Sequence, residues 1–399
     1  MQIFVNPNYH FVKHRWKGIA VSVLFILAGI GAYLAWGINW GIDFAGGAAV
    51  TLKFRDAVPL NELRNDLPTA TIQQYGKAED RAIYIRLPEQ KAETDYAGQV
   101  TEQLRKKLNP EGDAKLDINY WGKDRLSALL KQKDPDNRGT NPNAITYYDQ
   151  LAQKIIDKRS QVGVFTSMQQ ATGTEGVTGN VARVINENCY LGRFNVLNQE
   201  TVGPAVGADL QRKAILAIIL SSLAMGIYIW VRFDFVFGVG AVACIIHDVA
   251  ISLAFLLIMR LEASLNVVAA LLTIVGYSIN DTVVMYDRVR ENKRKIKKPM
   301  SMAEHLDLAI NQTLSRTILT SGSVFLVLVA LLVFGGDVIR GFAWILLMGV
   351  ISGTYSTLLV VPAVALAMDR WSNKKKPVAV PARVESNRTE APVRKRKAS

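Results

Sequence analysis

The sequence predicts a polytopic α-helical membrane protein with six transmembrane helices and one folded α+β domain outside the membrane. Two features support this fold class: six long stretches with almost no charge, and one long polar segment between the first and second of them. The chain has 399 residues, of which 50% are hydrophobic and 20% charged, and its mean hydropathy is +0.14. Ordinary soluble domains contain about 25% charged residues. This pattern excludes a soluble enzyme, a disulfide-stapled secreted domain and a disordered chain.

Each uncharged stretch has the length that a membrane-spanning helix needs, roughly 17 to 25 residues for about 30 Å of hydrocarbon. The stretches are residues 18–42, 214–231, 235–259, 263–280, 317–336 and 341–368, the third interrupted by Asp248. We assign the first transmembrane helix to residues 18–38 and the other five to residues 213–369. The first stretch is longer than a signal-peptide core of about 7 to 15 apolar residues, and no persuasive cleavage site follows it. We therefore expect it to remain as an anchor.

The net charge of +13 is concentrated beside the spans, whereas residues 39–213 carry 23 basic and 22 acidic side chains. Three basic clusters stand out: Lys13, Arg15 and Lys17; seven residues between 288 and 298; and Arg370 with Lys374, Lys375 and Lys376. Lys and Arg in short flanking loops mark the cytoplasmic side. This places the N-terminus (1–17), the loop after the fourth span and the C-terminus inside. The basic end of the chain could bind RNA, but such a run is usually a solvated tail, and we expect residues 370–399 to be disordered.

The external segment, residues 39–212, shows alternating strand and helix patterns. We expect strands at 47–54, 82–87 and 194–202 and helices at 60–67 and 97–108. This alternation predicts a ferredoxin-like α+β sandwich. The pattern loosens at about 110–192, which we interpret as an insertion with a turn-rich break at 134–143, a helix at 147–158 and a loop at 171–180. Cys189 and Cys244 lie in different regions and are not expected to form a disulfide.

An amphipathic helix is expected on the inner side, within residues 287–316. Ser301 and Glu304 have the spacing of a capping box. Its apolar residues, Met302, Leu306, Ala309, Ile310 and Leu314, share one face, so the helix should lie on the membrane and continue into the fifth span. It serves either as an anchor, which we favour, or as a moving coupling element.

Ionisable residues at membrane depth cost roughly 2.5 to 3.5 kcal/mol on insertion scales, so each calls for an explanation. Asp281 follows Asn280 in the fourth span; it is either a carboxyl that loads and releases a proton or an interfacial acid paired with Arg288. Arg316 opens the fifth span, as the partner of Asp281 or as a positive-inside anchor.

A second polar pair, His247 and Asp248, lies near the middle of the third span. The pair is either a relay or a polar bridge between helices, and the sequence leaves both open. Small residues should allow close helix contacts, first of all Gly349 and Gly353, and in the same way Gly29, Gly31, Gly238, Gly240 and Gly276. We find no Walker loop, HExxH, GxSxG or Cys/His cluster, so we expect no enzyme, metal or cofactor.

Four sequence blocks carry a resemblance to a known family. They are GIDFAGG at 41–47, VGPAVG at 202–207, GYSINDTVV at 276–284 continued by DRVREN at 287–292, and NQTLSRTILTS at 311–321. With the single large loop after the first span, they make the chain resemble the SecF branch of the SecD/SecF family, in the resistance-nodulation-division superfamily. The resemblance covers about residues 10–110 and 195–370. The insertion and the tail depart from the family pattern.

The resemblance implies half of a resistance-nodulation-division-type bundle in the bacterial inner membrane, with the large loop in the periplasm. It implies a SecD partner, association with the SecYEG channel and with YajC, and use of the proton motive force to assist preprotein export after the ATP-driven stage. The family's proton-pathway residues correspond to Asp281 and Arg316, with His247, Asp248 and Asn280 as polar support. Asp43, Gly46 and Gly47 match the family's signature turn, whose role could be only that of a tight turn. The alternatives are a half-size proton-coupled exporter of lipids or small molecules and a structural clamp that moves no protons.

Overall fold

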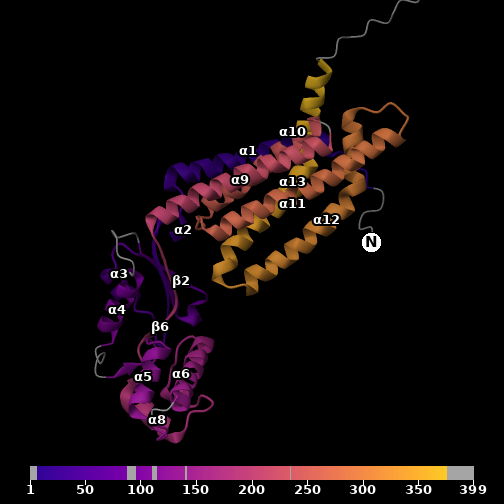
Figure 1. Cartoon of the computed structure of the whole chain (residues 1–399). Coiled ribbons are helices and arrows are strands. Elements are labelled where there is room, and N and C mark those ends of the chain that lie inside the picture. Colours follow the sequence, from indigo (N-terminus) through magenta and orange to yellow (C-terminus); the bar gives the residue numbers. More distant parts are fainter. Residues whose placement is uncertain (1–6, 88–95, 110–114, 140–141, 234, 375–399) are drawn as a thin grey trace, which may run out of the picture.

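The computed structural model describes residues 7–87, 96–109, 115–139, 142–233 and 235–374. In this part of the chain, six helices are long and apolar enough to cross a membrane, as predicted. They are α1 (Phe11–Trp36), α9 (Pro204–Arg232), α10 (Phe235–Ile258), α11 (Leu265–Lys295), α12 (Met302–Phe334) and α13 (Asp337–Lys374). Figure 1 shows them as one bundle, with the external domain beyond one end of it and the N-terminal end of α1 at the other.

The helices extend past the uncharged stretches that predicted them. The first helix begins at Phe11 rather than at residue 18, so Lys13, Arg15 and Lys17 are helical, and it ends at Trp36 because Gly37 adopts a φ of +68°. α9 begins at Pro204, a residue that suits the first position of a helix. α11 continues to Lys295 through the expected basic loop, and α13 continues to Lys374 through residues assigned to the tail. Backbone hydrogen bonding does not stop where apolar side chains stop. Residues 375–399 lie outside the described part.

The external domain has the expected ferredoxin-like order of elements, βαββαβ. It contains β1 (Gly47–Phe54), α3 (Leu60–Asp66), β2 (Thr71–Tyr75), the 3₁₀ turn η1 (Ala78–Asp80), β3 (Ala82–Leu87), α4 (Tyr96–Leu108) and β6 (Phe194–Val202). The strands form one antiparallel sheet in the order β2-β3-β1-β6. β1, β3 and β6 match the predicted strands. β2 was not predicted, because its mostly exposed TIQQY sequence has little apolar pattern.

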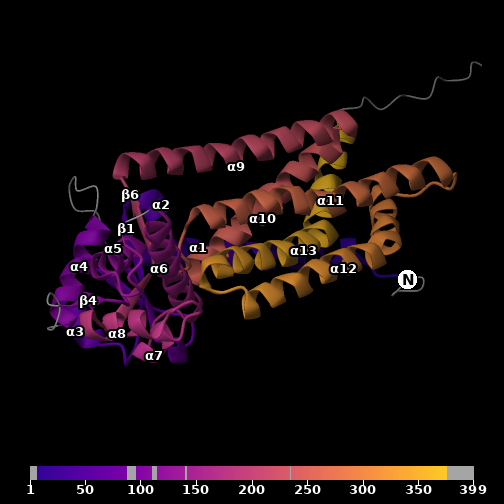
Figure 2. The same cartoon turned by 60° about the horizontal axis from the view of Figure 1, so that its bottom comes forward.

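The insertion forms a separate helical layer on this domain. It comprises β4 (Leu116–Asp117), α5 (Lys123–Lys133), α6 (Pro142–Val162), α7 (Met168–Thr172), α8 (Gly179–Asn188) and β5 (Cys189–Tyr190), with β4 and β5 parallel. It has its own core around Tyr148, Ile155 and Phe165. Figure 1 shows it at the end of the external domain that is far from the bundle, and Figure 2 shows the same layer with that end turned toward the viewer. The loop predicted at 171–180 is reduced to 173–178, because α7 and α8 take its ends.

The predicted capping box at the start of α12 is confirmed. The Glu304 carboxylate accepts from the Ser301 backbone N–H at 2.7 Å, and Ser301 Oγ accepts from the Glu304 N–H at 3.3 Å. The helix then runs unbroken to Phe334, so the amphipathic segment and the fifth span are one helix. Leu306, Ala309 and Ile310 on the predicted face are buried.

Close helix contacts occur at some of the expected glycines. A Cβ at Gly349 would overlap Ile274 of α11, and one at Gly353 would lie 3.4 Å from Ser278. Gly29 of α1 lies against Ala254 of α10 in the same way. Gly238 and Gly240 also contact neighbouring side chains, whereas Gly31 and Gly276 meet nothing within 4 Å. Cys189 and Cys244 are both buried and free.

Candidate functional site

Asp281 lies on the buried side of α11, where its side chain is 4% exposed. Among the described residues, its hydrogen bond comes from Asn280 Nδ2 at 3.4 Å. The Arg316 guanidinium of α12 acts on this carboxyl electrostatically, but Arg316 is exposed and forms no ion pair with Asp281 within 4.0 Å. The structure therefore brings the two predicted residues into one neighbourhood without direct contact.

The alternative prediction, that Asp281 pairs with Arg288, is wrong. Arg288 Nη1 instead bonds Glu291 Oε2 at 2.5 Å. Seven residues along a helix correspond to about 10 Å, whereas residues three or four apart are neighbours. Arg288 therefore pairs within its own turn and leaves Asp281 without a cationic contact on its own helix.

A row of hydroxyl groups joins three helices next to Asp281. Tyr277, one turn earlier on α11, donates to Ser321 Oγ of α12 at 3.1 Å. Thr354 of α13 donates to the same oxygen at 2.7 Å. These contacts connect the helix that carries Asp281 to the helix that carries Arg316.

The second predicted pair lies in a polar cluster inside the bundle. Asp248 is fully buried, and His247 Nδ1 lies 2.9 Å from its Oδ1. Three serine hydroxyls donate to the carboxylate: Ser278 of α11 at 2.5 Å, and Ser352 and Ser356 of α13 at 2.6 and 2.9 Å. On its other side, His247 Nε2 meets Ser22 Oγ of α1 at 2.7 Å. The pair thus connects α10 to three other helices.

The sequence analysis missed these serines and Ser22. One signal was available, because Ser352 and Ser356 are four residues apart and therefore share a helix face. Nothing in the sequence indicated that this face points at Asp248, because the crossing of α10, α11 and α13 is set by tertiary packing.

The signature turn forms the junction between the bundle and the external domain. Gly41 and the short helix α2 (Ile42–Ala45) follow α1, and Gly46 and Gly47 adopt φ values of +74° and +114°. A side chain at Gly46 would be strained in this conformation, so glycine is required there. A Cβ at Gly207 of α9 would lie 2.9 Å from the Phe44 carbonyl, so this glycine allows α9 to pack on the turn.

Asp43 does more than complete this turn. Its Oδ2 accepts from the backbone N–H of Leu265, the first residue of α11, at 2.8 Å. Ser264, at the usual capping position, makes no side-chain capping bond. The Gly41 N–H donates to the Ala263 carbonyl at 2.8 Å, and the Ala263 N–H donates to the Asn39 carbonyl at 2.8 Å. The turn is therefore bonded to the start of the helix that carries Asp281.

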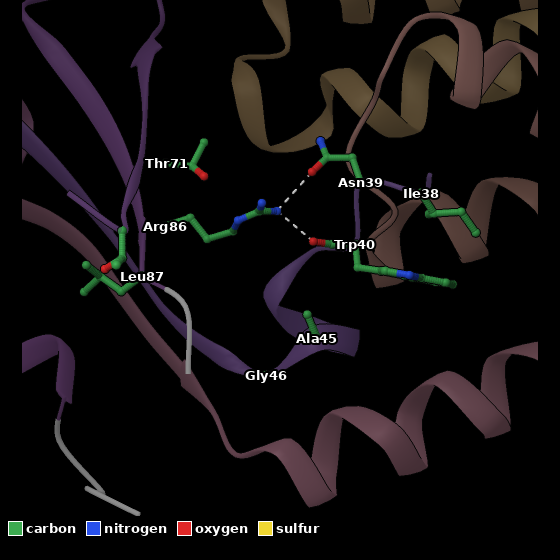
Figure 3. A pocket seen from close by; sticks show the side chains of 9 residues that line it. Ile38, Asn39, Trp40, Ala45, Gly46, Thr71, Arg86 and Leu87 are labelled. Carbon is green, nitrogen blue, oxygen red and sulfur yellow. Dashed lines mark hydrogen bonds between the residues drawn. The ribbon is translucent and has the colours of Figure 1, made fainter. Parts of the chain in front are cut away.

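Arg86 of β3 joins the sheet to the same place. Its Nη1 donates to Asn39 Oδ1 at 3.1 Å and to the Trp40 carbonyl at 2.7 Å, beside a cavity of about 390 Å³ (Figure 3). Glu262, in the loop before α11, is half-buried here. Burial raises the pKa of Glu262 above its ordinary value, and the Arg86 charge partly offsets the rise. Burial and the carboxylate of Glu262 likewise raise the pKa of Tyr84 on β3.

Comparison with known proteins shows which family the chain matches. The SecD/SecF GG motif matches residues 37–58, and the family described as protein export membrane protein SecD/SecF, C-terminal, matches residues 183–371. Protein translocase subunit SecF of Koribacter versatilis is 36% identical over 397 residues, covering 96% of each chain. The chain belongs to the SecF family of protein translocase subunits. SecF of Gemmatimonas aurantiaca is 31% identical, over 93% of this chain and 90% of that one.

Solved SecDF structures share the fold. SecDF of Thermus thermophilus, described as a translocon-associated membrane protein, matches 93% of this chain at 29% identity with a TM-score of 0.63. A second SecDF structure, in a super-membrane-facing form, matches 94% at 29% identity with a TM-score of 0.54. The chain spans 40% of the length of each of these proteins. The SecF family assignment therefore rests on both sequence and architecture, and the protein is a multi-pass membrane protein.

The matched regions divide between two parts of the molecule. The SecD/SecF GG motif covers the signature turn and β1, where Asp43 and the two glycines with positive φ lie. The C-terminal region covers the end of the insertion and the five helices from α9 to α13, including both intramembrane acids. Among the described residues, no three His, Cys, Asp or Glu side chains are grouped so that they could hold a metal ion.

Proposed function

We propose that this chain works with a SecD subunit at the SecYEG channel of the bacterial inner membrane and uses the proton motive force to assist preprotein export. It would act after the ATP-driven stage, with its external domain in the periplasm, both termini in the cytoplasm and YajC as a further partner. The observation that carries the proposal is Asp281, a carboxyl 4% exposed on a membrane-spanning helix, with the Arg316 charge acting on it.

The energetics support such a role for Asp281. One elementary charge that crosses about 100 mV is worth about 2.3 kcal/mol, enough to bias a two-state motion several-fold. A proton on Asp281 would remove the charge that interacts with Arg316 and so change the packing of α11 against α12. Because Asp43 bonds the start of α11, the change has a direct path to the root of the external domain.

The test replaces Asp281 with Asn in cells depleted of their own SecF, and follows preprotein secretion and proton flux. Because Asn cannot ionise, both should fall to the level of depleted cells. Asp287→Asn is the matched control, since Asp287 is an exposed acid on the same helix and should tolerate the change. Undiminished secretion and flux in Asp281→Asn would defeat the assignment. If Asp281→Asn loses secretion but the wild type itself shows no proton flux, the structural clamp is favoured.

A further inference from the structure

We propose that His247 and Asp248 form a second proton-binding site in the centre of the bundle, distinct from Asp281, which exchanges its proton through Ser22. The inference starts from charge. Asp248 is fully buried on a membrane-spanning helix, and among the described residues its ion-pair partner is His247, with no Lys or Arg in contact. An ionised carboxylate beside a neutral imidazole would leave an uncompensated charge at membrane depth, which is costly. One proton on the pair makes it neutral.

The hydrogen bonds around Asp248 fit an ionised carboxylate. Oδ1 accepts from Ser352 and His247, and Oδ2 accepts from Ser278 and Ser356. The Cys244 thiol is a fifth, weaker donor to Oδ2 at 3.5 Å, and a carboxyl group met only by donors has the pattern of an ionised acceptor. The proton then resides on His247, which donates through Nδ1 to Asp248 and through Nε2 to Ser22.

The other side of His247 provides an exchange route. Ser22 Oγ lies 3.2 Å from the Tyr355 hydroxyl and 3.3 Å from the Gly18 carbonyl, and the Tyr355 hydroxyl donates to that same carbonyl. When His247 is protonated, Ser22 accepts from it and gives its own hydrogen to Tyr355 or Gly18. When His247 is neutral, Ser22 can turn its hydrogen to Nε2. Rotation of the Ser22 hydroxyl thus keeps Nε2 hydrogen-bonded in both states. A proton leaves when His247 passes it to Ser22 Oγ while Ser22 passes its own hydrogen to the Tyr355 hydroxyl, which releases its hydrogen to water, and it enters by the reverse steps.

The route has a direction. Gly18 is seven residues from the start of α1, or about 10 Å along the helix. Figure 1 shows the N-terminal end of α1 at the end of the bundle far from the external domain. Among the described residues, the titratable groups that face the pair are Cys244 of α10, whose Sγ lies 3.5 Å from Asp248 Oδ2, and Tyr355 of α13, whose ring centroid lies 6.1 Å from that of His247, whereas α1 contributes Ser22. Asp281 lies one turn beyond Ser278 on α11, whereas Asp248 is on α10. Ser278 therefore links the helix of Asp281 to Asp248, and no hydrogen bond joins the two acids in the described part of the chain.

The site can be tested on the purified full chain in nanodiscs by ¹⁵N NMR of its imidazoles. The chain has four histidines, and His247→Gln identifies the His247 signals by subtraction. In the wild type we expect both imidazole nitrogens of His247 to carry protons, and in Asp248→Asn we expect the neutral form, because the buried positive charge would lose its carboxylate partner. An infrared band of a protonated carboxyl that disappears in Asp248→Asn, together with a neutral His247, would place the same proton on Asp248 and also support the site.

Two outcomes would overturn the inference. A neutral His247 with no protonated carboxyl in the wild type shows that the pair binds no proton, and this result needs no variant to fold beyond His247→Gln. Conversion of His247 to the neutral form in Asp281→Asn, with the signals of the other histidines unchanged, shows that the two sites are one. The route has its own test. Ser22→Ala should slow deuterium exchange at His247 Nε2, and unchanged exchange would show that the proton does not pass through Ser22. Because none of these measurements uses export, the proposed function can fail while this site stands.

Discussion

The Asp43 carboxylate takes the place of a helix cap for a segment 222 residues away. The first backbone N–H groups of a helix have no partner within it, and a carboxylate there satisfies one of them and interacts favourably with the helix dipole. The signature turn thus has a reason for an acid at this position that a tight turn alone does not give.

Replacing Asp43 with Ala should destabilise the first turn of α11 by about 1 kcal/mol, the usual cost of losing a cap. Asp43→Asn keeps an acceptor and should lose less. Hydrogen exchange of the amides at the start of α11 measures the effect, because protection falls as the turn opens more often. Ser264→Ala is the matched control, since Ser264 makes no capping bond. Equal loss of protection in Asp43→Ala and Ser264→Ala would contradict the capping role.

Glu262 gives the junction a dependence on pH. Its pKa in the folded protein is raised by burial, with Asp43 and Glu200 adding to the rise. The folded state therefore holds this proton more tightly than the unfolded chain, and the stability it contributes is lost as the pH rises from the ordinary glutamate value through the raised one. Glu262→Gln should flatten this part of the stability curve. Thermal unfolding of the two proteins across this pH range measures it, and parallel curves would show that Glu262 does not contribute.

At the scale of elements, contact between α11 and α13 depends on glycine. Gly349 and Gly353 of α13 face Ile274 and Ser278 of α11, one turn apart on each helix. The backbones can approach closely because no side chain separates them. Ser352 and Ser356, on the same stretch of α13, donate to Asp248 of α10.

A methyl group at Gly349 should weaken this packing. Gly349→Ala would overlap Ile274, which is buried, and overpacking of this kind typically costs about 1 to 3 kcal/mol. Gly276→Ala is the control on α11, because a Cβ there meets nothing within 4 Å and alanine favours a helix. The midpoint of thermal unfolding in detergent should fall only for Gly349→Ala. A lower midpoint for both variants would point to a general intolerance of the bundle rather than to this contact.

The sequence predicted most elements because their patterns are local. Long uncharged stretches predicted the six spans, and alternation of apolar and polar residues predicted β1, β3 and β6. Helix ends were misplaced at Lys295 and Lys374, since polar residues continue a helix once it is formed. The candidate site was predicted only in part. Asp281, Asp248 and Asp43 are conspicuous in the sequence, but the crossing of the helices decides that Ser278 and Ser352 donate to Asp248 and that the Leu265 N–H donates to Asp43. Arg86 was missed because nothing local marks one arginine of a strand as a junction residue.

At the scale of the whole molecule, the bundle and the external domain meet at a small set of contacts. The chain enters the domain through the signature turn and leaves it through β6 into α9, which packs on that turn at Gly207. Asp43 bonds this root to α11, and Arg86 bonds it to the sheet. Movement of the start of α11 should therefore reach the sheet through very few residues.

Arg86→Gln should loosen the external domain relative to the bundle, because it removes the bonds to Asn39 and Trp40. Spin labels on cysteines introduced at Gln161 of α6 and Leu326 of α12 would report the distance between the two parts, since both positions are exposed and the native cysteines are buried. We expect a broader distance distribution than in the wild type. Arg81→Gln is the matched control, because Arg81 bonds the Arg55 carbonyl within the domain at 2.6 Å. If all three distributions have the same width, Arg86 does not hold the junction, and the backbone bonds between residues 39–41 and Ala263 are sufficient to fix the domain.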